Sequence, residues 1–320
     1  MTARVLTVIL NYRTADLALR CLDSLAPELD GSFSVVVADN DSQDGSAAKI
    51  AQGIQDKGYA GWAKLMALPK NGGFAYGNNA PVRAAWERGE RPDYVHLLNP
   101  DTEVRPGAIR ALVSFMDQNP RVGIAGSRLE DPDGTPQRSA FRFPTWTSEL
   151  ETYAKTGPIS RALDRYIVAP PVPEQAVRTD WVAGASMIIR RAVIDAIGLM
   201  DEAYFLYFEE TDYCLAASRA GWPTWYVPES RVMHLVGAAT ELSDARRHRR
   251  RRPTYWFDSR RRYFMKNFGS TASVLADASL VLGASIHRAR AAVARQDSQD
   301  PPHFIRDLLL HAAGRTKPKT

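Results

Sequence analysis

Short apolar runs alternate with amphipathic segments over the first 118 residues, and this alternation restricts the possible folds more than any other feature of the sequence. The runs are rich in β-branched residues and have the length of strands, whereas the segments between them carry apolar residues at helical spacing. Strands are expected at Val5–Leu10, Phe33–Ala38, Leu65–Leu68 and Tyr94–Leu98. Because strands that alternate with helices form a mostly parallel sheet with helices on both faces, the predicted fold class is α/β.

The second half of the chain does not continue this alternation. Asp131–Gly134 predicts a turn between two segments that could pair as a hairpin. One strand is expected at Trp181–Ile189, and one helix at Glu209–Arg219, where Gly221 provides a C-terminal signal. The sequence after about residue 250 indicates a helical C-terminal appendage.

Composition excludes several classes of protein. The chain is 45% hydrophobic and 24% charged, which is typical of a globular protein in water. Its two cysteines, Cys21 and Cys214, lie far apart in helical patterns, so neither a disulfide framework nor a paired metal-ligand spacing is expected. The apolar run near the N-terminus is too short for a signal peptide, and we expect no stretch to reach the roughly 20 apolar residues of a membrane span. A cytoplasmic location follows.

Each strand of the first half ends in a polar loop of the kind that a nucleotide site needs. The residues are Asn11, Tyr12 and Arg13 after the first strand, Asp39 after the second, Asn71, Gly73, Phe74 and Asn79 after the third, and Asn99 and Asp101 after the fourth. Ligands of open parallel sheets bind at the carboxyl ends of the strands, where these loops would meet. A carboxylate such as Asp39 can accept the imide N–H of uracil or thymine. Taken singly, each loop has an ordinary explanation as a turn or a helix cap.

Seven motifs follow one another in a fixed order over about residues 4–268. They are VILNYR, VVVADNDSQDGS, KNGGFAYGNN, LLNPDTEV, WVAGASMIIRR, FLYFEETDYCLAASRAGW and VMHLVGAAT. In this order the chain resembles the family 2 glycosyltransferases, and within them the bacterial rhamnosyltransferase-like enzymes that build surface polysaccharides. The resemblance implies the GT-A fold, a nucleotide-diphosphate-sugar donor, a divalent cation (Mg²⁺ or Mn²⁺) and inversion at the anomeric carbon.

The resemblance also implies roles for individual residues of the donor site. Asp39 corresponds to the base-contacting aspartate of the family, and Asn71, Gly73 and Asn79 fall in its nucleotide loop. The remaining residues assigned to the donor by the same likeness are Asn11, Tyr12, Arg13, Phe74, Asn99 and Thr240.

The metal side of the site departs from the family pattern. Asp101 corresponds to the last aspartate of the family's D-x-D motif, the metal and diphosphate ligand, and His234 to a histidine that completes the metal shell or touches the diphosphate. The first acid of D-x-D is replaced by Asn99, and an alanine stands beside Thr240 where serine or glycine is usual. The cation is therefore expected to meet one carboxylate where the family has two.

Glycosyl transfer also needs a base, because the acceptor hydroxyl must lose its proton as it attacks. The family places this base in a motif like F-E-D-x-D at the start of a helix, and residues 208–212 read FEETD, so Glu210 stands where aspartate is usual. The extra methylene shifts the carboxylate, and a misplacement of about 1 Å can cost about 100-fold in rate. Without the resemblance, three acids in a first turn are explained by the helix dipole alone. We expect Glu210 to be the base, with a contribution from Asp212 or Glu209 left open.

Positive charge is concentrated toward the C-terminus. Residues 241–270 carry ten arginines or lysines against three acids, and aromatic residues alternate with them. A solvated basic face is the plain explanation, and nucleic-acid binding has no recognised module to support it. We favour contact with an anionic membrane surface, with the aromatics and Val274–Ile286 at the interface.

These interpretations combine into one prediction with two alternatives. A catalytic domain is expected over residues 1–245, divided into a nucleotide-sugar half (about 1–128) and an acceptor half (about 129–245), followed by a basic, helix-rich segment at 246–320. The expected donor is dTDP-L-rhamnose, with a UDP-sugar as alternative, and the expected acceptor is a glycan or a polyprenyl-diphosphate-linked sugar at the inner face of the plasma membrane. No nucleic-acid partner is expected, and a homodimer is left open. The alternatives are an inactive nucleotide- or carbohydrate-binding homologue and a sugar nucleotidyltransferase, although the glycine- and arginine-rich opening of the latter is missing.

Overall fold

The computed structural model describes residues 4–28, 31–235, 250–296 and 300–314. The chain divides into two compact units. Unit 1 contains residues 1–141, 171–205 and 209–241, and unit 2 contains residues 142–170, 206–208 and 242–320. Residues 142–170 thus group with the C-terminal segment, which the sequence did not indicate. The expected boundary at residue 245 stays a prediction.

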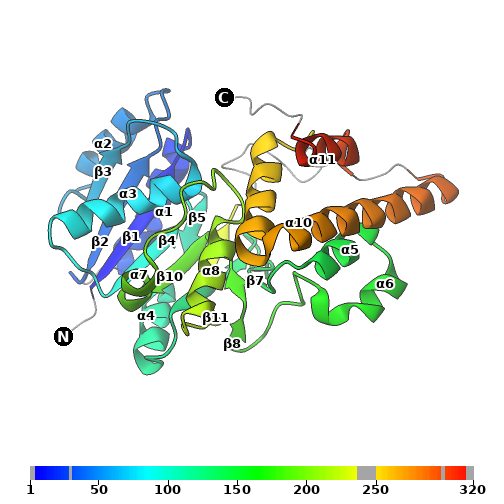
Figure 1. The fold of residues 1–320 in the computed structure, drawn as a ribbon. Helices are drawn as coiled ribbons and strands as arrows, with labels where there is room; N and C mark the ends of the chain where they lie inside the picture. The colour runs from blue at the N-terminus through cyan, green and yellow to red at the C-terminus, as the bar shows by residue number, and fades with distance from the viewer. Residues whose placement is uncertain (1–3, 29–30, 236–249, 297–299, 315–320) are drawn as a thin grey trace. The chain divides into compact units, whose positions relative to one another are not determined.

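Unit 1 is built on a mixed sheet of mostly parallel strands (Figure 1). Its strands are β1 (Val5–Asn11), β2 (Phe33–Asp39), β3 (Ala63–Ala67), β4 (Tyr94–Leu98), β5 (Thr102–Val104), β6 (Ile124–Glu130), β8 (Val177–Thr179), β10 (Ser186–Arg190) and β11 (Thr224–His234). Their order is β3-β2-β1-β4-β10-β6-β11-β5, and β8 pairs with β11. The first four strands are parallel to one another, whereas β10 runs antiparallel between β4 and β6. The predicted α/β class is confirmed.

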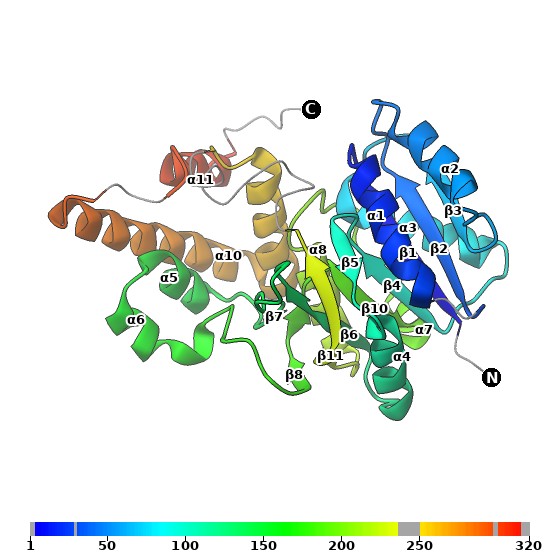
Figure 2. The ribbon, with the colours of Figure 1, turned by 180° about the vertical axis from the view of Figure 1, so that it is seen from behind.

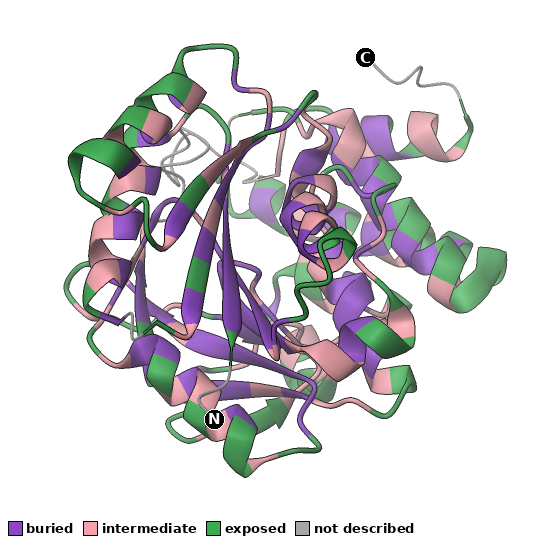
Figure 3. Ribbon diagram, turned by 90° about the vertical axis from the view of Figure 1, so that its left-hand side faces the viewer, coloured by how far each residue is buried: buried purple, intermediate pink, exposed green. Residues whose placement is uncertain are grey.

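Helices cover both faces of this sheet. They are α1 (Ala15–Leu25), α2 (Ser46–Asp56), α3 (Gly73–Glu87), α4 (Ala108–Gln118), α7 (Arg191–Ile197) and α8 (Glu209–Arg219). Figure 1 shows α3, α7 and α8 in front of the sheet, and Figure 2 shows α1 and α4 on the opposite face. The β-branched residues of β1 and β2 form part of the core between the sheet and the helices that pack on it, and Figure 3 shows the central strands as buried. Burial on both faces is what the continuous apolar runs predicted.

One expected strand is interrupted. The predicted strand Trp181–Ile189 forms two pieces, β9 (Trp181–Val182), which pairs with β7 (Ala140–Phe141), and β10. Between them, a Cβ on Gly184 would lie 2.9 Å from the ring of Phe74, so the side chain of a larger residue would displace this ring. The break lets the chain pass close to the start of α3.

Unit 2 is helical and has its own core. Its helices are α5 (Trp146–Ala154), α6 (Gly157–Ala162), α10 (Thr254–Val293) and α11 (Phe304–Ala312). The backbone of α10 departs from helical geometry at Gly269. The second half of α10 packs on α5, and a Cβ on Gly283 would lie 2.8 Å from the carbonyl oxygen of Leu150. Arg260 is buried and pairs with Glu149 and Asp277.

Two expectations for the C-terminal segment are wrong. Trp256, Phe257, Tyr263 and Phe264 are buried in unit 2, so they are core residues and do not lie at a lipid interface. In addition, α10 is long and apolar enough to cross a membrane by length and composition alone. Alanine, serine and glycine dilute the apolar residues of this segment, so it does not stand out in the sequence. Few charges lie between Ser270 and His287, however.

Candidate functional site

The ends of β1 and β2 are joined by a hydrogen-bonded cluster around Asp39. Asn11 pairs with Asp39 in the parallel register, and its Nδ2 donates to Asp39 Oδ1 over 2.7 Å. The hydroxyl of Ser42 donates to the same oxygen over 2.6 Å, and the backbone N–H of Ser42 donates to Oδ2 over 3.1 Å. Asp39 is 3% exposed. Its carboxylate therefore orders the loop, and since each carboxylate oxygen can accept two hydrogen bonds, Oδ2 keeps capacity for a further donor.

Tyr12 and Arg13 lie at the outer side of this cluster. The Arg13 guanidinium carbon is 5.0 Å from the centre of the Tyr12 ring, and Arg13 Nε donates to the carbonyl oxygen of Ser42 over 3.1 Å. Tyr12 is 38% exposed, which leaves its ring accessible to a ligand. Sequence reasoning missed Ser42, although aspartate side chains in turns commonly accept hydrogen bonds from nearby backbone N–H groups.

The loop before α3 is fixed by Asn40, which was also missed. Asn40 Nδ2 donates to Asn71 Oδ1 over 2.9 Å and to the carbonyl oxygen of Gly73 over 3.2 Å, so the second and third loops are tied together. Gly73 has a φ of +85°, and a Cβ there would lie 2.0 Å from the carbonyl oxygen of Phe205. The backbone N–H of Phe74 donates to that same oxygen over 2.8 Å. Only glycine permits this close approach.

Asn79 is not brought to the loop edge with the other asparagines. It lies inside α3, where its Nδ2 donates to the carbonyl oxygen of Met200 over 2.7 Å and to Glu202 over 3.0 Å. Its Oδ1 accepts the backbone N–H of Met200 over 3.2 Å. The amide thus fastens residues 200–202 to α3, and its assignment to the nucleotide stays a prediction.

Asp101 and His234 are brought together by the pairing of β5 with β11. His234 lies opposite Thr102 in the antiparallel register, and the backbone N–H of Leu235 donates to the carbonyl oxygen of Asp101 over 2.9 Å. As a result, His234 Nε2 lies 3.6 Å from Asp101 Oδ1, and the Asp101 side chain is 4% exposed. Asn99 precedes this pair, and its backbone N–H donates to the carbonyl oxygen of Ala185.

This pair has the chemistry of a divalent-cation site. Two ligands that each lie about 2.1 Å from one cation are between about 3.0 and 4.2 Å apart, and the observed 3.6 Å falls in this range. Carboxylate oxygen is a preferred ligand of Mg²⁺ and Mn²⁺, and imidazole nitrogen is a common ligand of first-row transition metals. Among the described residues, no group of three or more His, Cys, Asp or Glu side chains gathers at one place. Asp101 and His234 would therefore share a cation with other oxygen ligands. Thr240 lies outside the described residues.

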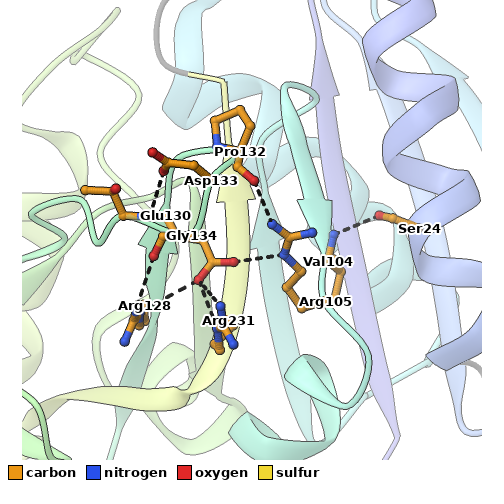
Figure 4. A network of polar contacts seen from close by, with 10 residues as sticks. Ser24, Val104, Arg105, Arg128, Glu130, Pro132, Asp133, Gly134 and Arg231 are labelled. Atoms are coloured by element: carbon orange, nitrogen blue, oxygen red, sulfur yellow. Dashed lines mark hydrogen bonds and ion pairs between the residues drawn. The ribbon is translucent and has the colours of Figure 1, made fainter.

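A buried glutamate anchors the strands that carry this pair (Figure 4). Glu130, at the end of β6, accepts hydrogen bonds from Arg105 beyond β5 over 2.8 Å and from Arg231 of β11 over 2.9 Å. Arg128 lies 3.7 Å away. Although burial alone would raise it, the hydrogen bonds from Arg231 and Arg105 hold the pKa of Glu130 below its usual range. The carboxylate joins β5, β6 and β11 at one point.

Glu210 lies in the first turn of α8, where its side chain is half-buried and its Oε2 is shielded from solvent. Burial raises the pKa of the Glu210 carboxyl, and hydrogen bonds from the backbone N–H groups of Glu210 and Gly184 counteract this rise only in part. Its Oε2 has no hydrogen-bond partner among the residues that the structure describes. Glu209 and Asp212 are both 3% exposed. A carboxylate with a raised pKa and a vacant oxygen has the properties of a general base.

Comparison with known sequences gives one consistent result. The family model "Glycosyltransferase like family 2" matches residues 3–255. The N-acetylglucosaminyl-diphospho-decaprenol L-rhamnosyltransferase of Mycobacterium tuberculosis is 29% identical over 248 residues, which are 73% of this chain and 76% of that protein. Rhamnosyltransferase WbbL of Escherichia coli K12 is 22% identical over 72% of this chain and 83% of its own length. The dTDP-rhamnosyl transferase RfbF of Shigella flexneri is 24% identical over 74% and 71%.

Two solved structures share the fold at low sequence identity. The mannosyltransferase PcManGT from Pyrobaculum calidifontis, in complex with GDP-Man and Mn²⁺, superposes with a TM-score of 0.59 at 14% identity, over 98% of this chain and 80% of that one. GalNAc-T7, with UDP, GalNAc and Mn²⁺, superposes with a TM-score of 0.53 at 17% identity. The latter match spans 73% of this chain and 44% of that one.

Proposed function

The chain belongs to glycosyltransferase family 2, and on this premise we propose that it transfers L-rhamnose from dTDP-L-rhamnose, with inversion, to a hydroxyl of a lipid-linked or growing glycan. It is a glycosyltransferase with the GT-A fold. The observation that carries the proposal is the half-buried Glu210, whose carboxyl has a raised pKa and lies in the same unit as the Asp101–His234 pair. A base and a diphosphate-side cation site are the two parts that the reaction needs.

The Asp39 cluster supports a pyrimidine nucleotide. Asp39 Oδ2 accepts one backbone N–H and has room for a second donor, which the imide N–H of thymine or uracil would supply. Tyr12 offers an exposed ring beside it. RfbF of Shigella flexneri is named for dTDP-rhamnose, and the relatives from Mycobacterium tuberculosis and Escherichia coli are named for rhamnose. These names support dTDP-L-rhamnose over a UDP-sugar.

Asp101 and His234 would hold a Mg²⁺ or Mn²⁺ ion against the donor diphosphate. When bound, this ion supplies positive charge that stabilises the departing diphosphate. Both superposed structures were obtained with Mn²⁺, which supports this use of the fold. We propose that Asn99 lies against the diphosphate as a neutral donor, as expected from its motif.

Glu210 would take the proton from the acceptor hydroxyl. The raised pKa makes its carboxylate a stronger base than an exposed glutamate, and the Gly184 N–H holds the carboxylate in place. The acceptor oxygen attacks the anomeric carbon from the face opposite the diphosphate, so the configuration inverts. Asp212 is the alternative base.

We propose that unit 2 contacts an anionic lipid surface through α10. The exposed side of its second half bears an uncharged stripe, defined by Thr271, Val274, Leu275, Ala278, Leu282, Ser285, Ala289 and Val293. Val274 and Leu282 are 66% and 54% exposed. Exposed cations stand before and after the stripe, among them Arg261 and Arg290, and they complement anionic head groups. Such a contact supports a polyprenyl-diphosphate-linked acceptor at the cytoplasmic face of the membrane.

A donor panel tests the proposed reaction. Purified protein with Mn²⁺ is incubated with dTDP-rhamnose, UDP-glucose, UDP-N-acetylglucosamine or GDP-mannose and a polyprenyl-diphosphate-linked N-acetylglucosamine acceptor, and the product is analysed by mass spectrometry and NMR. We expect transfer from dTDP-rhamnose, with the anomeric configuration opposite to that of the donor. Transfer from another donor alone would overturn the assigned sugar, and retention would overturn the role of Glu210.

The two alternatives give different results in the same assay. Tight nucleotide binding without turnover of any donor would indicate an inactive binding homologue, the class favoured by Asn99 in place of an acid. Formation of a nucleotide-sugar from a nucleoside triphosphate and a sugar phosphate would indicate a nucleotidyltransferase.

A further inference from the structure

Gln137 follows the Asp131–Gly134 turn, and its side chain makes three hydrogen bonds at the edge of the cation site. Its Nε2 donates to Asp131 Oδ1 over 2.7 Å and to the backbone carbonyl oxygen of His234 over 2.8 Å. Both partners are acceptors, so this end of the amide must be the nitrogen. The orientation of the Gln137 side chain is thereby fixed.

The fixed amide determines which nitrogen of His234 carries a proton. Gln137 Oε1 lies 3.2 Å from His234 Nδ1, and an amide oxygen can only accept a hydrogen bond. Nδ1 must therefore be the N–H donor. Because a neutral imidazole has a single N–H, Nε2 then carries the lone pair, and Nε2 is the atom that lies 3.6 Å from Asp101 Oδ1.

We propose that Gln137 is a positioning residue that holds His234 in the Nδ1–H tautomer, so that Nε2 is presented as a metal ligand beside Asp101. The proposal rests on the cation site of the proposed function. The opposite tautomer would direct an Nε2–H toward the Asp101 carboxylate, which is an acceptor, and this proton would block the cation. Gln137 selects against that competing state.

The same contacts join the site to the anchored strands. Asp131, which fixes the Gln137 amide, directly follows Glu130, the carboxylate held by Arg105 and Arg231. The loop that carries Gln137 is thus fastened to β5, which Asp101 directly precedes, and to β11, which ends at His234. Outer-shell partners of this kind typically change metal affinity by about 10- to 100-fold when they are removed.

The tautomer can be measured without metal or substrate. Long-range ¹H–¹⁵N NMR of ¹⁵N-histidine protein at alkaline pH distinguishes the two ring nitrogens, and the His234 signals are assigned by their loss in His234→Asn. We expect wild-type His234 to be protonated at Nδ1. In Gln137→Met, which keeps the side-chain volume, the signals should shift toward protonation at Nε2, whereas Gln118→Met, an exposed control in α4, should leave them unchanged. Protonation at Nε2 in the wild type would overturn the proposal.

Metal binding provides the second readout. Binding of Mn²⁺ in the presence of dTDP, followed by electron paramagnetic resonance, should weaken by about 10- to 100-fold in Gln137→Met. Unchanged Mn²⁺ affinity in Gln137→Met would also overturn the proposal. A wild-type protein with the Nδ1–H tautomer and no Mn²⁺ binding would instead contradict the proposed cation site, so the two failures are distinguishable.

Discussion

At the scale of single residues, Glu210 shows how burial prepares a carboxyl group for proton transfer. Its pKa is raised by burial, and the Gly184 N–H only partly offsets the shift. A folded-state pKa above the unfolded value stabilises the fold at acid pH, where the group is protonated, and this stabilisation is lost as the pH rises through the folded pKa. The base thus costs stability at the pH at which it works.

We predict that Glu210→Gln lowers kcat by about 10²- to 10⁴-fold, the usual contribution of a general base. Its Tm at pH 8 should not fall below that of the wild type, because the amide removes a charge that is disfavoured by desolvation. In the wild type, kcat should rise with pH through the pKa of Glu210. Rates and thermal unfolding of Glu210→Gln and Asp212→Asn check this, and full activity in the first variant with loss in the second would move the base to Asp212.

The replacement of an acid by Asn99 leads to a prediction about the cation. Asp101 is the carboxylate that faces His234, so much of the negative charge around the ion must come from the donor diphosphate. We predict that Mn²⁺ binds at least about tenfold more weakly to the protein alone than to the protein with dTDP. Calorimetric titrations with and without dTDP measure this difference. Tight binding to the nucleotide-free protein, abolished in Asp101→Asn, would contradict it.

At the scale of elements, the start of α3 depends on a close backbone approach. A Cβ on Gly73 would lie 2.0 Å from the Phe205 carbonyl oxygen, and the positive φ is a second obstacle to a side chain. Phe74 and Asn40 hold the same turn through hydrogen bonds. The loop that we assign to the nucleotide is thus shaped by packing against residues far along the chain.

We predict that Gly73→Ala destabilises the fold and weakens binding of dTDP. Gly58→Ala is a matched control, because Gly58 also has a positive φ, +72°, but a Cβ there meets nothing within 4 Å. In the control, the free energy of unfolding should fall by about 1 kcal/mol, because of the backbone conformation alone. Urea unfolding should show a larger loss for Gly73→Ala, and equal losses in the two variants would show that the contact with Phe205 is unimportant.

At the scale of the whole molecule, a chain of buried polar side chains crosses the sheet of unit 1. His96 of β4 contacts Thr7 Oγ1 through Nδ1 over 3.4 Å and Ser186 Oγ through Nε2 over 3.1 Å. Ser186 continues to Ser127, and Ser127 to Ser230, each over 2.7 Å. Burial lowers the pKa of His96 to about 3. The imidazole is therefore neutral in the folded protein and protonated in the unfolded chain below about pH 6.5.

This shift predicts sensitivity to acid. A histidine whose folded-state pKa is depressed contributes to stability above the unfolded-state pKa and loses this contribution as the pH falls below it. The free energy of unfolding then decreases by up to about 1.4 kcal/mol per pH unit between about pH 6 and 4. In His96→Gln, the free energy of unfolding should depend less steeply on pH than in the wild type, whatever its absolute value. Urea titrations at several pH values test this, with the exposed His303→Gln as control. Equal slopes in His96→Gln and the wild type would contradict the prediction.

The uncharged stripe of α10 gives a prediction for membrane binding. Replacing Leu275 and Leu282 together by serine removes two partly exposed leucines and should weaken sedimentation with phosphatidylglycerol vesicles by about tenfold. Val177→Ser, at an exposed apolar residue of unit 1, is the control. Binding of the wild type should also weaken with salt and when the arginines at 246–252 are neutralised. Unchanged binding in the leucine variant would refute the stripe as the contact.

The sequence by itself determined the alternating strands and helices of the first half and the order of the polar loops. Apolar periodicity is a local property, and the ends of parallel strands converge in any such sheet, so Asp39 and Asp101 were identified before their surroundings were known. The tertiary structure decided what depends on contacts between distant segments. It placed Asn79 against Met200, buried the C-terminal aromatics in unit 2, and brought Ser42, Asn40 and Gln137 to the site. A hydrogen bond between residues 97 positions apart, such as that of Gln137 with His234, leaves no periodic signal in the sequence, because only folding brings the two side chains together.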